Sequence, residues 1–252
     1  MGFGWTSRPA SSSAPQIDRG YPPLKKKILA LVLTGFSVLV LWTGCRPPQT
    51  VLSPVPQELR EIEGRASLKL TRNGETAKAR FSFVLDLPER GKIEVADILG
   101  GTVAEIYLQE YDAYFVLPGK KIYWQGGKEE CLEKFLGFRI SLREMSEMLC
   151  GRWADGPSKD AGFEGWTFER DSGGKIISGA KADVFFRVKE FFSGSGVPRK
   201  LVFNGSESEG SIMILALAYN KPLPVDIFSL DFLKKYSPRT WEEIETMLRH
   251  ES

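Results

Sequence analysis

Two stretches of strict alternation between apolar and polar residues, joined by Asn73-Gly74, constrain the fold of this chain most. The apolar positions are Ile62, Ala66, Leu68 and Leu70 in the first stretch and Ala79, Phe81, Phe83, Leu85 and Leu87 in the second. A period of two indicates a strand with one buried face, and Asn-Gly is the strongest short signal for a hairpin turn. The pattern predicts a long antiparallel hairpin.

Further strand-like segments follow at short and even spacing. They cover residues 91–97, 103–109, 112–117, 120–125, 163–170, 174–179, 183–191, 199–206 and 210–219. Gly and Pro separate most of them, which favours an antiparallel meander over alternating strands and helices. Residues 212–218 are apolar at every position, so we expect that strand to be covered on both faces.

Two helices are predicted in the middle of the strand run and a third near the C-terminus. The first spans residues 128–136 and ends at Gly137. Ser141 and Glu144 have capping-box spacing at the start of the second, residues 142–150, which Gly151 follows. Thr240 and Glu243 repeat this spacing before a helix with an apolar stripe. That terminal helix could dock on the domain or lie at a membrane interface.

These elements predict a mainly β fold, an incomplete half-barrel of about eleven antiparallel strands with a small helical lid, because a long antiparallel sheet must curl or close. Its interior is expected to be lined by aromatic side chains under the apolar face of the lid. The candidates are Phe81, Phe83, Tyr107, Phe115, Phe186 and Phe203, with Met145, Met148 and Leu149 from the lid. They could line a lipid cavity or form an ordinary packed core.

The N-terminal part of the chain has the features of a secretory signal. Lys25-Lys26-Lys27 precedes an apolar stretch that ends in Thr43-Gly44-Cys45, the order of a basic, an apolar and a small-residue region. A cysteine directly after the cut resembles a bacterial lipobox, with Trp42 where Leu is usual. Cys45 would then be the lipidated first residue of the mature protein. The alternative is an uncleaved anchor over residues 28–44.

This interpretation divides the chain into four parts. Residues 1–44 are an N-terminal extension and signal peptide, which could begin at Leu24. Residues 45–58 form a lipidated Pro-rich tether, expected to be extended. Residues 59–221 form the half-barrel domain, and residues 222–252 a C-terminal extension with a short helix.

Composition favours a binding protein over an enzyme. The chain has one histidine and a net charge of +2, and it lacks the Gly-x-Ser-x-Gly motif of a hydrolase. We expect no metal, no cofactor and no nucleic acid partner. Cys131 and Cys150 could form a disulfide in an oxidising compartment or remain two free buried thiols.

Four short segments resemble the LolB family of outer-membrane lipoprotein receptors. They are Glu63-Gly64-Arg65, Ile98-Leu99-Gly100, Leu136-Gly137-Phe138-Arg139-Ile140-Ser141-Leu142 and Leu149-Cys150-Gly151. The resemblance covers roughly residues 60–220 and implies a half-barrel of about eleven strands whose cavity holds the acyl chains of a lipoprotein. It also implies that the loop with Ile98 and Leu99 enters the membrane, whereas an isolated leucine could equally lie under its own loop.

The resemblance implies a monomeric palmitate-bearing lipoprotein on the periplasmic face of the outer membrane. It would take lipoprotein cargo from a periplasmic LolA-like carrier and help insert the cargo, with no catalysis. Two alternatives remain open. The same fold could bind another lipid or hydrophobic ligand, or a solid interior could serve a structural or interaction lipoprotein of the envelope.

Overall fold

The computed structural model describes residues 52–72, 74–97, 99–152, 165–205 and 208–249. All of them belong to one compact unit, residues 49–252. The predicted signal sequence and Cys45 lie outside the described residues.

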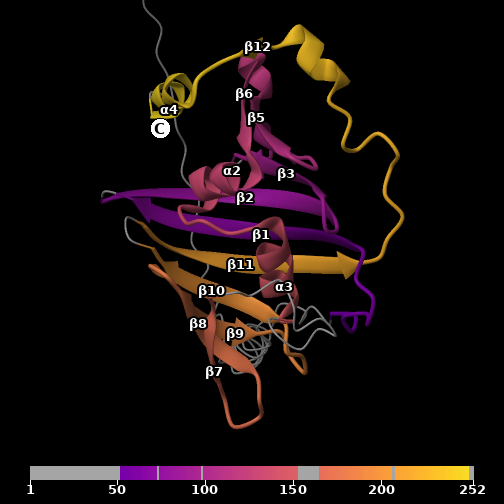
Figure 1. Cartoon of the computed structure of the whole chain (residues 1–252), viewed down its shortest axis with the longest axis vertical. Helices are drawn as coiled ribbons and strands as arrows, with labels where there is room; N and C mark the ends of the chain where they lie inside the picture. The colour runs from indigo at the N-terminus through magenta and orange to yellow at the C-terminus, as the bar shows by residue number, and fades with distance from the viewer. Residues whose placement is uncertain (1–51, 73, 98, 153–164, 206–207, 250–252) are drawn as a thin grey trace, which may run out of the picture. The chain divides into compact units, whose positions relative to one another are not determined.

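The core of this unit is a single sheet of twelve strands (Figure 1). Its order is β12-β6-β5-β4-β3-β2-β1-β11-β10-β9-β8-β7, and β7 and β12 are its two edges, so the sheet stays open. The strands are β1 (Glu61–Arg72), β2 (Glu75–Asp86), β3 (Arg90–Ala96), β4 (Thr102–Leu108), β5 (Asp112–Leu117), β6 (Ile122–Gly127), β7 (Thr167–Arg170), β8 (Ile176–Lys181), β9 (Val184–Phe191), β10 (Pro198–Asn204), β11 (Ser208–Tyr219) and β12 (Ser237–Pro238). This mainly β open sheet confirms the predicted incomplete barrel.

The predicted hairpin forms the centre of the sheet. β1 and β2 pair antiparallel from Glu61–Asp86 to Arg72–Glu75, and Gly74 in the turn has a φ of 81°, which glycine adopts at little cost. Ile62, Gly64, Ala66 and Leu68 are buried, whereas Glu63, Arg65 and Ser67 between them are exposed or half-buried. The alternation in the sequence therefore sets the two faces of the sheet.

The twelfth strand comes from the C-terminal extension. The two-residue β12 pairs parallel with the start of β6, joining Ser237 to Ile122 and Pro238 to Tyr123. The other neighbouring strands pair antiparallel. The sequence predicted about eleven strands because a two-residue strand carries no recognisable alternation.

Two helices cover one face of the sheet, which we call the inner face (Figure 1). α2 spans Lys128–Leu136 and ends at Gly137, whose φ is 83°. α3 spans Leu142–Cys150 and ends at Gly151. Its capping box is present as predicted, because the side chains of Ser141 and Glu144 each accept a hydrogen bond from the other residue's backbone N–H.

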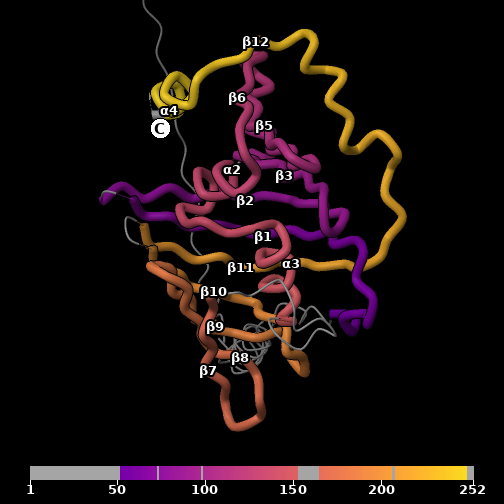
Figure 2. Tube along the Cα trace, in the orientation of Figure 1, coloured from indigo at the N-terminus to yellow at the C-terminus, as the bar shows by residue number. Residues whose placement is uncertain are grey.

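The C-terminal segment wraps from one part of the sheet to another (Figure 2). It leaves β11 and is held where Gln109 Nε2 donates a hydrogen bond to the Phe228 carbonyl oxygen at 3.0 Å. It continues through the 3-10 turn η2 (Asp231–Lys235) to β12 and α4 (Trp241–Arg249). Ile244 in α4 is completely buried, so α4 is docked on the domain.

One strand is less covered than predicted. In β11 the register pairs Ala66 with Ile214 and Arg65 with Ala216, which leaves Leu215 between them as a bulge. A bulged residue turns out of the regular pleat, and Leu215 is 43% exposed. The expectation that residues 212–218 are covered on both faces is therefore wrong at this position.

The described part of the predicted tether lies against the domain. Leu52, Val55 and Leu59 pack on the core. The Arg152 guanidinium donates to the carbonyl oxygens of Pro56 at 3.2 Å and Gln57 at 3.1 Å. These contacts hold residues 52–59 on the folded unit.

Each of the three α-helices in the described residues has nine residues. A bilayer-spanning helix needs about 20, so no helix in the described part of the chain could cross a membrane.

Candidate functional site

The inner face of the sheet and the apolar side of α3 form the predicted site. Phe81 and Phe83 project from β2 towards Met145, Met148 and Leu149 of α3, and all five side chains are buried. Strand alternation and helical spacing bring these residues together as the sequence predicted.

The space between α3 and the sheet is nearly filled. The remaining cavity measures about 10 Å³ and is lined only by apolar side chains, close to the smallest volume that holds one water molecule. Phe135 of α2 packs edge-on against Phe81, with ring centroids 5.4 Å apart. Of the two alternatives that the sequence left open, the region under α3 matches a packed core, because ring and methionine side chains fill it.

Tyr107 does not belong to this site, which corrects the prediction. Its strand β4 buries Ala104, Ile106 and Leu108 on the inner face, so Tyr107 projects from the opposite, outer face. There its ring contacts Phe232 of the C-terminal segment at 5.4 Å. Burial raises the pKa of Tyr107 to about 12, which keeps the hydroxyl protonated at neutral pH.

Phe115 lies on the inner face but under α4. Trp241 packs edge-on against Phe115 at 5.3 Å and against Trp124 at 5.6 Å. The Lys134 ammonium of α2 lies 4.8 Å from the centre of the Trp241 ring, within cation–π range. The C-terminal helix thus covers the part of the inner face that α3 does not reach.

The other two predicted aromatic residues are covered by loop side chains. Phe203 packs against Phe138 at 4.6 Å, and Phe186 packs against Trp166 at 5.5 Å. Both are 2% exposed. All the inner-face candidates are buried, but they are spread along the sheet, where α3, α4 and loop side chains each cover some of them.

A buried carboxylate fastens the start of α3 to the β7–β8 edge. Glu144 Oε1 accepts hydrogen bonds from Lys181 Nζ at 2.6 Å and from Trp166 Nε1 at 2.7 Å. Glu144 Oε2 accepts from the Ser141 backbone N–H at 2.9 Å and the Ser141 hydroxyl at 3.0 Å. Burial alone would raise the pKa of Glu144, but the hydrogen bonds from Lys181, Ser141 and Trp166 outweigh it and lower that pKa.

The β3–β4 loop presents Leu99 to solvent. Asp97 Oδ1 accepts hydrogen bonds from the backbone N–H groups of Leu99 at 2.8 Å and Gly101 at 2.9 Å, which hold the loop in a tight turn. The Leu99 side chain is 91% exposed, so it does not lie under its own loop. Ile98 lies outside the described residues.

Cys131 and Cys150 are free and buried, so of the two alternatives the structure contains the pair of thiols. Burial raises the pKa of each thiol to about 12. Neither sulfur is a thiolate at neutral pH, and both act as small apolar side chains in the core.

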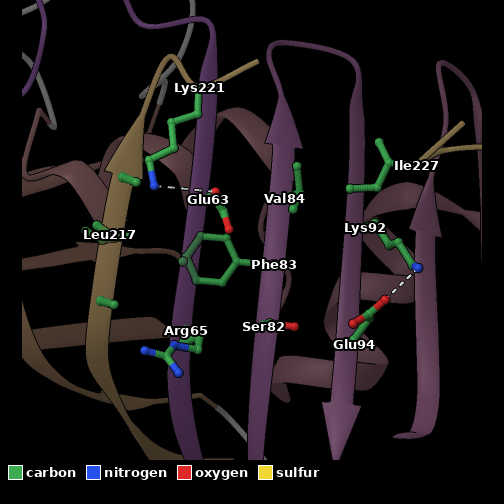
Figure 3. Close-up of a pocket in the computed structure, with 13 residues that line it drawn as sticks. Glu63, Arg65, Ser82, Phe83, Val84, Lys92, Glu94, Leu217, Lys221 and Ile227 are labelled. Carbon is green, nitrogen blue, oxygen red and sulfur yellow. Dashed lines mark ion pairs between the residues drawn. The ribbon is translucent and has the colours of Figure 1, made fainter. Parts of the chain in front are cut away.

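The outer face carries a groove that the sequence did not indicate. Its volume is about 490 Å³, and its floor crosses β11, β1, β2 and β3 beneath Ile227 of the C-terminal segment. Charged residues line it (Figure 3): Lys221 Nζ lies 4.0 Å from a Glu63 carboxylate oxygen, and Lys92 Nζ lies 2.6 Å from Glu94. Arg65 projects from β1 on the same face (Figure 3).

Comparisons with known proteins find similarity among solved structures only. No protein-family model and no curated protein sequence matches the chain. A DUF1329 family protein from Desulfovibrio piger aligns with a TM-score of 0.46 and 12% identity, over 70% of this chain and 92% of its own. A LolA superfamily protein from Nitrosomonas europaea has a TM-score of 0.43 and 12% identity, over 71% and 93%.

A third structure is a domain named as an outer membrane lipoprotein-sorting protein from Vibrio parahaemolyticus. It aligns with a TM-score of 0.42 and 9% identity, over 69% of this chain and 92% of its own.

The sequence did not reveal the partners of Glu144, or the contacts of Trp241 with Phe115 and Trp124. Glu144 was visible only as a capping-box residue, because Trp166 and Lys181 are 22 and 37 residues away along the chain. A cap has a fixed local spacing, whereas a contact between distant elements leaves no periodic signal.

Proposed function

We propose that this protein binds the acyl chains of lipoproteins between α3 and the inner face of the sheet, and helps to insert them into a membrane. One observation carries the proposal. The interface under α3 consists of aromatic, methionine, leucine and isoleucine side chains around an apolar remnant cavity of about 10 Å³. An acyl chain would replace these contacts with similar ones when α3 moves outward.

The construction of α3 supports such a movement. The helix has only nine residues, and Met145 and Met148 on its inner side have unbranched, adaptable side chains. Gly151 at its end has a φ of 68°, a conformation that frees the chain to change direction. The Glu144 hydrogen bonds with Trp166 and Lys181 fasten the closed state.

Burial of the acyl chain would drive its uptake without any chemical reaction. Each CH₂ group removed from water contributes about 0.8 kcal/mol to the free energy of binding. A site that shields several CH₂ groups can therefore hold an acyl chain until a bilayer receives it. Transfer of this kind breaks no covalent bond, and we therefore propose a non-enzymatic role.

The finer features of the proposal follow from the sequence. Lipidation of Cys45 would anchor the protein, and the resemblance of its segments to the LolB family points to the periplasmic face of the outer membrane. A LolA-like carrier would supply the cargo. Leu99, 91% exposed at the end of its loop, would enter the receiving bilayer.

The filled interior favours one second candidate. If α3 never leaves the sheet, the aromatic cluster is a solid core, and the protein is an interaction lipoprotein of the envelope. Binding of another lipid differs from the leading proposal only in the ligand.

Mass spectrometry of the full chain, purified gently from membranes, separates these functions. We expect acylated peptides or proteins to co-purify, and to be lost from a Met148→Lys variant whose circular dichroism and thermal melt show a folded domain. Free phospholipid or fatty acid alone would support the lipid-binding alternative. Absence of any acyl compound other than the protein's own anchor, both in the wild type and in a Glu144→Ala variant with α3 released, would overturn the proposal in favour of a solid core.

A further inference from the structure

Four cations gather on the outer face of the central hairpin. Arg65 and Lys69 project from β1, and Lys78 and Arg80 from β2, and all four side chains are exposed. They share one face, because the residues that alternate with them, such as Ala66, Leu68 and Phe81, are buried on the inner face. Lys69 and Lys78 lie directly opposite each other in the register.

None of these four side chains forms an ion pair within the described residues. Of the acidic groups on this face, Glu63 faces Lys221 and Glu94 binds Lys92. The exposed Glu209 of β11 lies opposite Thr71, diagonally across from Lys69. Like charges placed directly opposite each other destabilise a sheet. A cluster with this excess of positive charge fits a surface that meets an anionic partner.

The position of the cluster indicates the kind of partner. Arg80 pairs with Ala96, the last residue of β3, so the cations lie beside the loop that presents Leu99. In that loop Leu99 is 91% exposed, and Val103 at its far side is 46% exposed. Exposed apolar side chains next to basic ones are typical of surfaces that bind anionic membranes, where cations meet phosphates and apolar groups enter the acyl boundary.

The groove gives this surface a place for one headgroup. Arg65 lines it (Figure 3), and a guanidinium can bind a phosphate through two parallel hydrogen bonds. We infer that the outer face around Arg65, Lys69, Lys78 and Arg80, together with the Leu99 loop, docks on a bilayer that displays anionic phospholipid. The inference extends the proposed function, because Leu99 serves in both, but it does not require a ligand under α3.

Vesicle binding tests the inference separately from acyl-chain binding. The fragment 49–252 is a compact unit that contains the hydrophobic core of the described residues, so it can be studied without the proposed anchor. It is mixed with vesicles of phosphatidylcholine, or of phosphatidylcholine with about one third phosphatidylglycerol, and recovered by flotation. We expect binding to the anionic vesicles only, and weaker binding as salt rises.

A matched pair of double variants locates the binding surface. Lys69→Gln with Lys78→Gln should lower affinity for the anionic vesicles about 25-fold, since each cation near such a surface contributes roughly a factor of five. Lys235→Gln with Arg239→Gln removes the same charge from exposed positions of the C-terminal segment and should change affinity by less than about twofold. Equal losses in the two variants, equal binding to both vesicles, or binding to neither would overturn the inference.

A stability measurement excludes a merely structural role for the cations. Lys78→Glu places opposite charges on the Lys69–Lys78 pair, so Tm should rise by about 1–3 °C while vesicle binding falls. A fall in both would indicate damage to the fold and would count against the inference. Vesicle binding by a wild-type protein that binds no acyl chain would instead contradict the proposed function alone.

Discussion

Trp166 Nε1 donates a hydrogen bond of 2.7 Å to Glu144 Oε1, which joins the residue before β7 to the first turn of α3. Lys181 at the end of β8 donates to the same oxygen at 2.6 Å. The helix that covers the candidate acyl site is thus fastened to the sheet edge through one carboxylate. If α3 opens, these bonds must break first.

Replacing Glu144 should therefore release α3. Glu144→Ala removes the acceptor for Lys181 and Trp166 and the capping box with Ser141, and we expect the free energy of unfolding to fall by about 2 kcal/mol. Uptake of a fluorescent acyl probe should become faster, as stopped-flow fluorescence would record. Trp166→Phe is the matched comparison, because it removes one of these hydrogen bonds while an aromatic ring remains beside Phe168 and Phe186. Unchanged uptake in Glu144→Ala would show that this carboxylate does not hold α3.

Acid should loosen the same contact. The pKa of Glu144 is lowered in the folded state, so its stabilising contribution is fully present above the ordinary glutamate pKa of about 4.3 and is lost as pH falls through the lowered value. The difference in unfolding free energy between wild type and Glu144→Gln should be constant from neutral pH to about pH 5 and shrink below that. Urea titrations across this range measure it. A difference that grows towards acid would contradict the ionised state of Glu144.

Leu99→Glu should slow the delivery of an acyl chain to a membrane while leaving the binding of that chain intact. The side chain is 91% exposed, so the substitution should change the unfolding free energy by less than about 0.5 kcal/mol. Transfer of a bound acyl probe to vesicles should slow about tenfold, because a charged side chain replaces a leucine that would enter the bilayer. Val225→Glu, at a residue equally open to solvent in the C-terminal segment, is the control. Similar transfer rates in the two variants would remove the membrane role of Leu99.

Gly64 and Phe83 should behave as a coupled pair. A Cβ atom added at Gly64 would lie 2.4 Å from Phe83 Cζ, so Gly64→Ala should destabilise the domain by about 1–3 kcal/mol. Phe83→Leu removes the clashing ring edge, and the double variant should be less destabilised than the two single changes added together. If the destabilisations of the two single variants simply add in urea melts, the Phe83 ring is not the cause of the destabilisation by Gly64→Ala.

The two core cysteines should be inert in the folded protein. Burial raises the pKa of both thiols to about 12, and iodoacetamide reacts with the thiolate. In the fragment 49–252 we expect no alkylation under native conditions and modification of both residues in denaturant, as intact mass spectrometry would detect. Rapid native labelling would show that the helices open frequently, and unlabelled cysteines in denaturant would reveal a disulfide.

The elements of this protein could be predicted from sequence because each is encoded by neighbouring residues. Alternation specified the buried face of β1 and β2, since side chains of a strand point to opposite faces in turn. The Ser141–Glu144 spacing located the start of α3, because a capping box joins residues three positions apart. The same local signals failed for β12, which is too short to show a period, and for Leu215, which a bulge turns outward.

Only the tertiary structure decided whether the interior is open or filled. That outcome depends on how Phe135, Met145 and Met148 pack against the two aromatic rings of β2. Residue periodicity does not show whether side chains from distant segments together fill the space between them. It also decided the face on which Tyr107 is buried, because the C-terminal segment covers the outer side that alternation marks as solvent. Local hydrogen bonds can be predicted from the spacing of residues in the sequence. Side-chain packing and the pairing of charges distant in sequence depend on the folded structure, because they form only after the chain has folded.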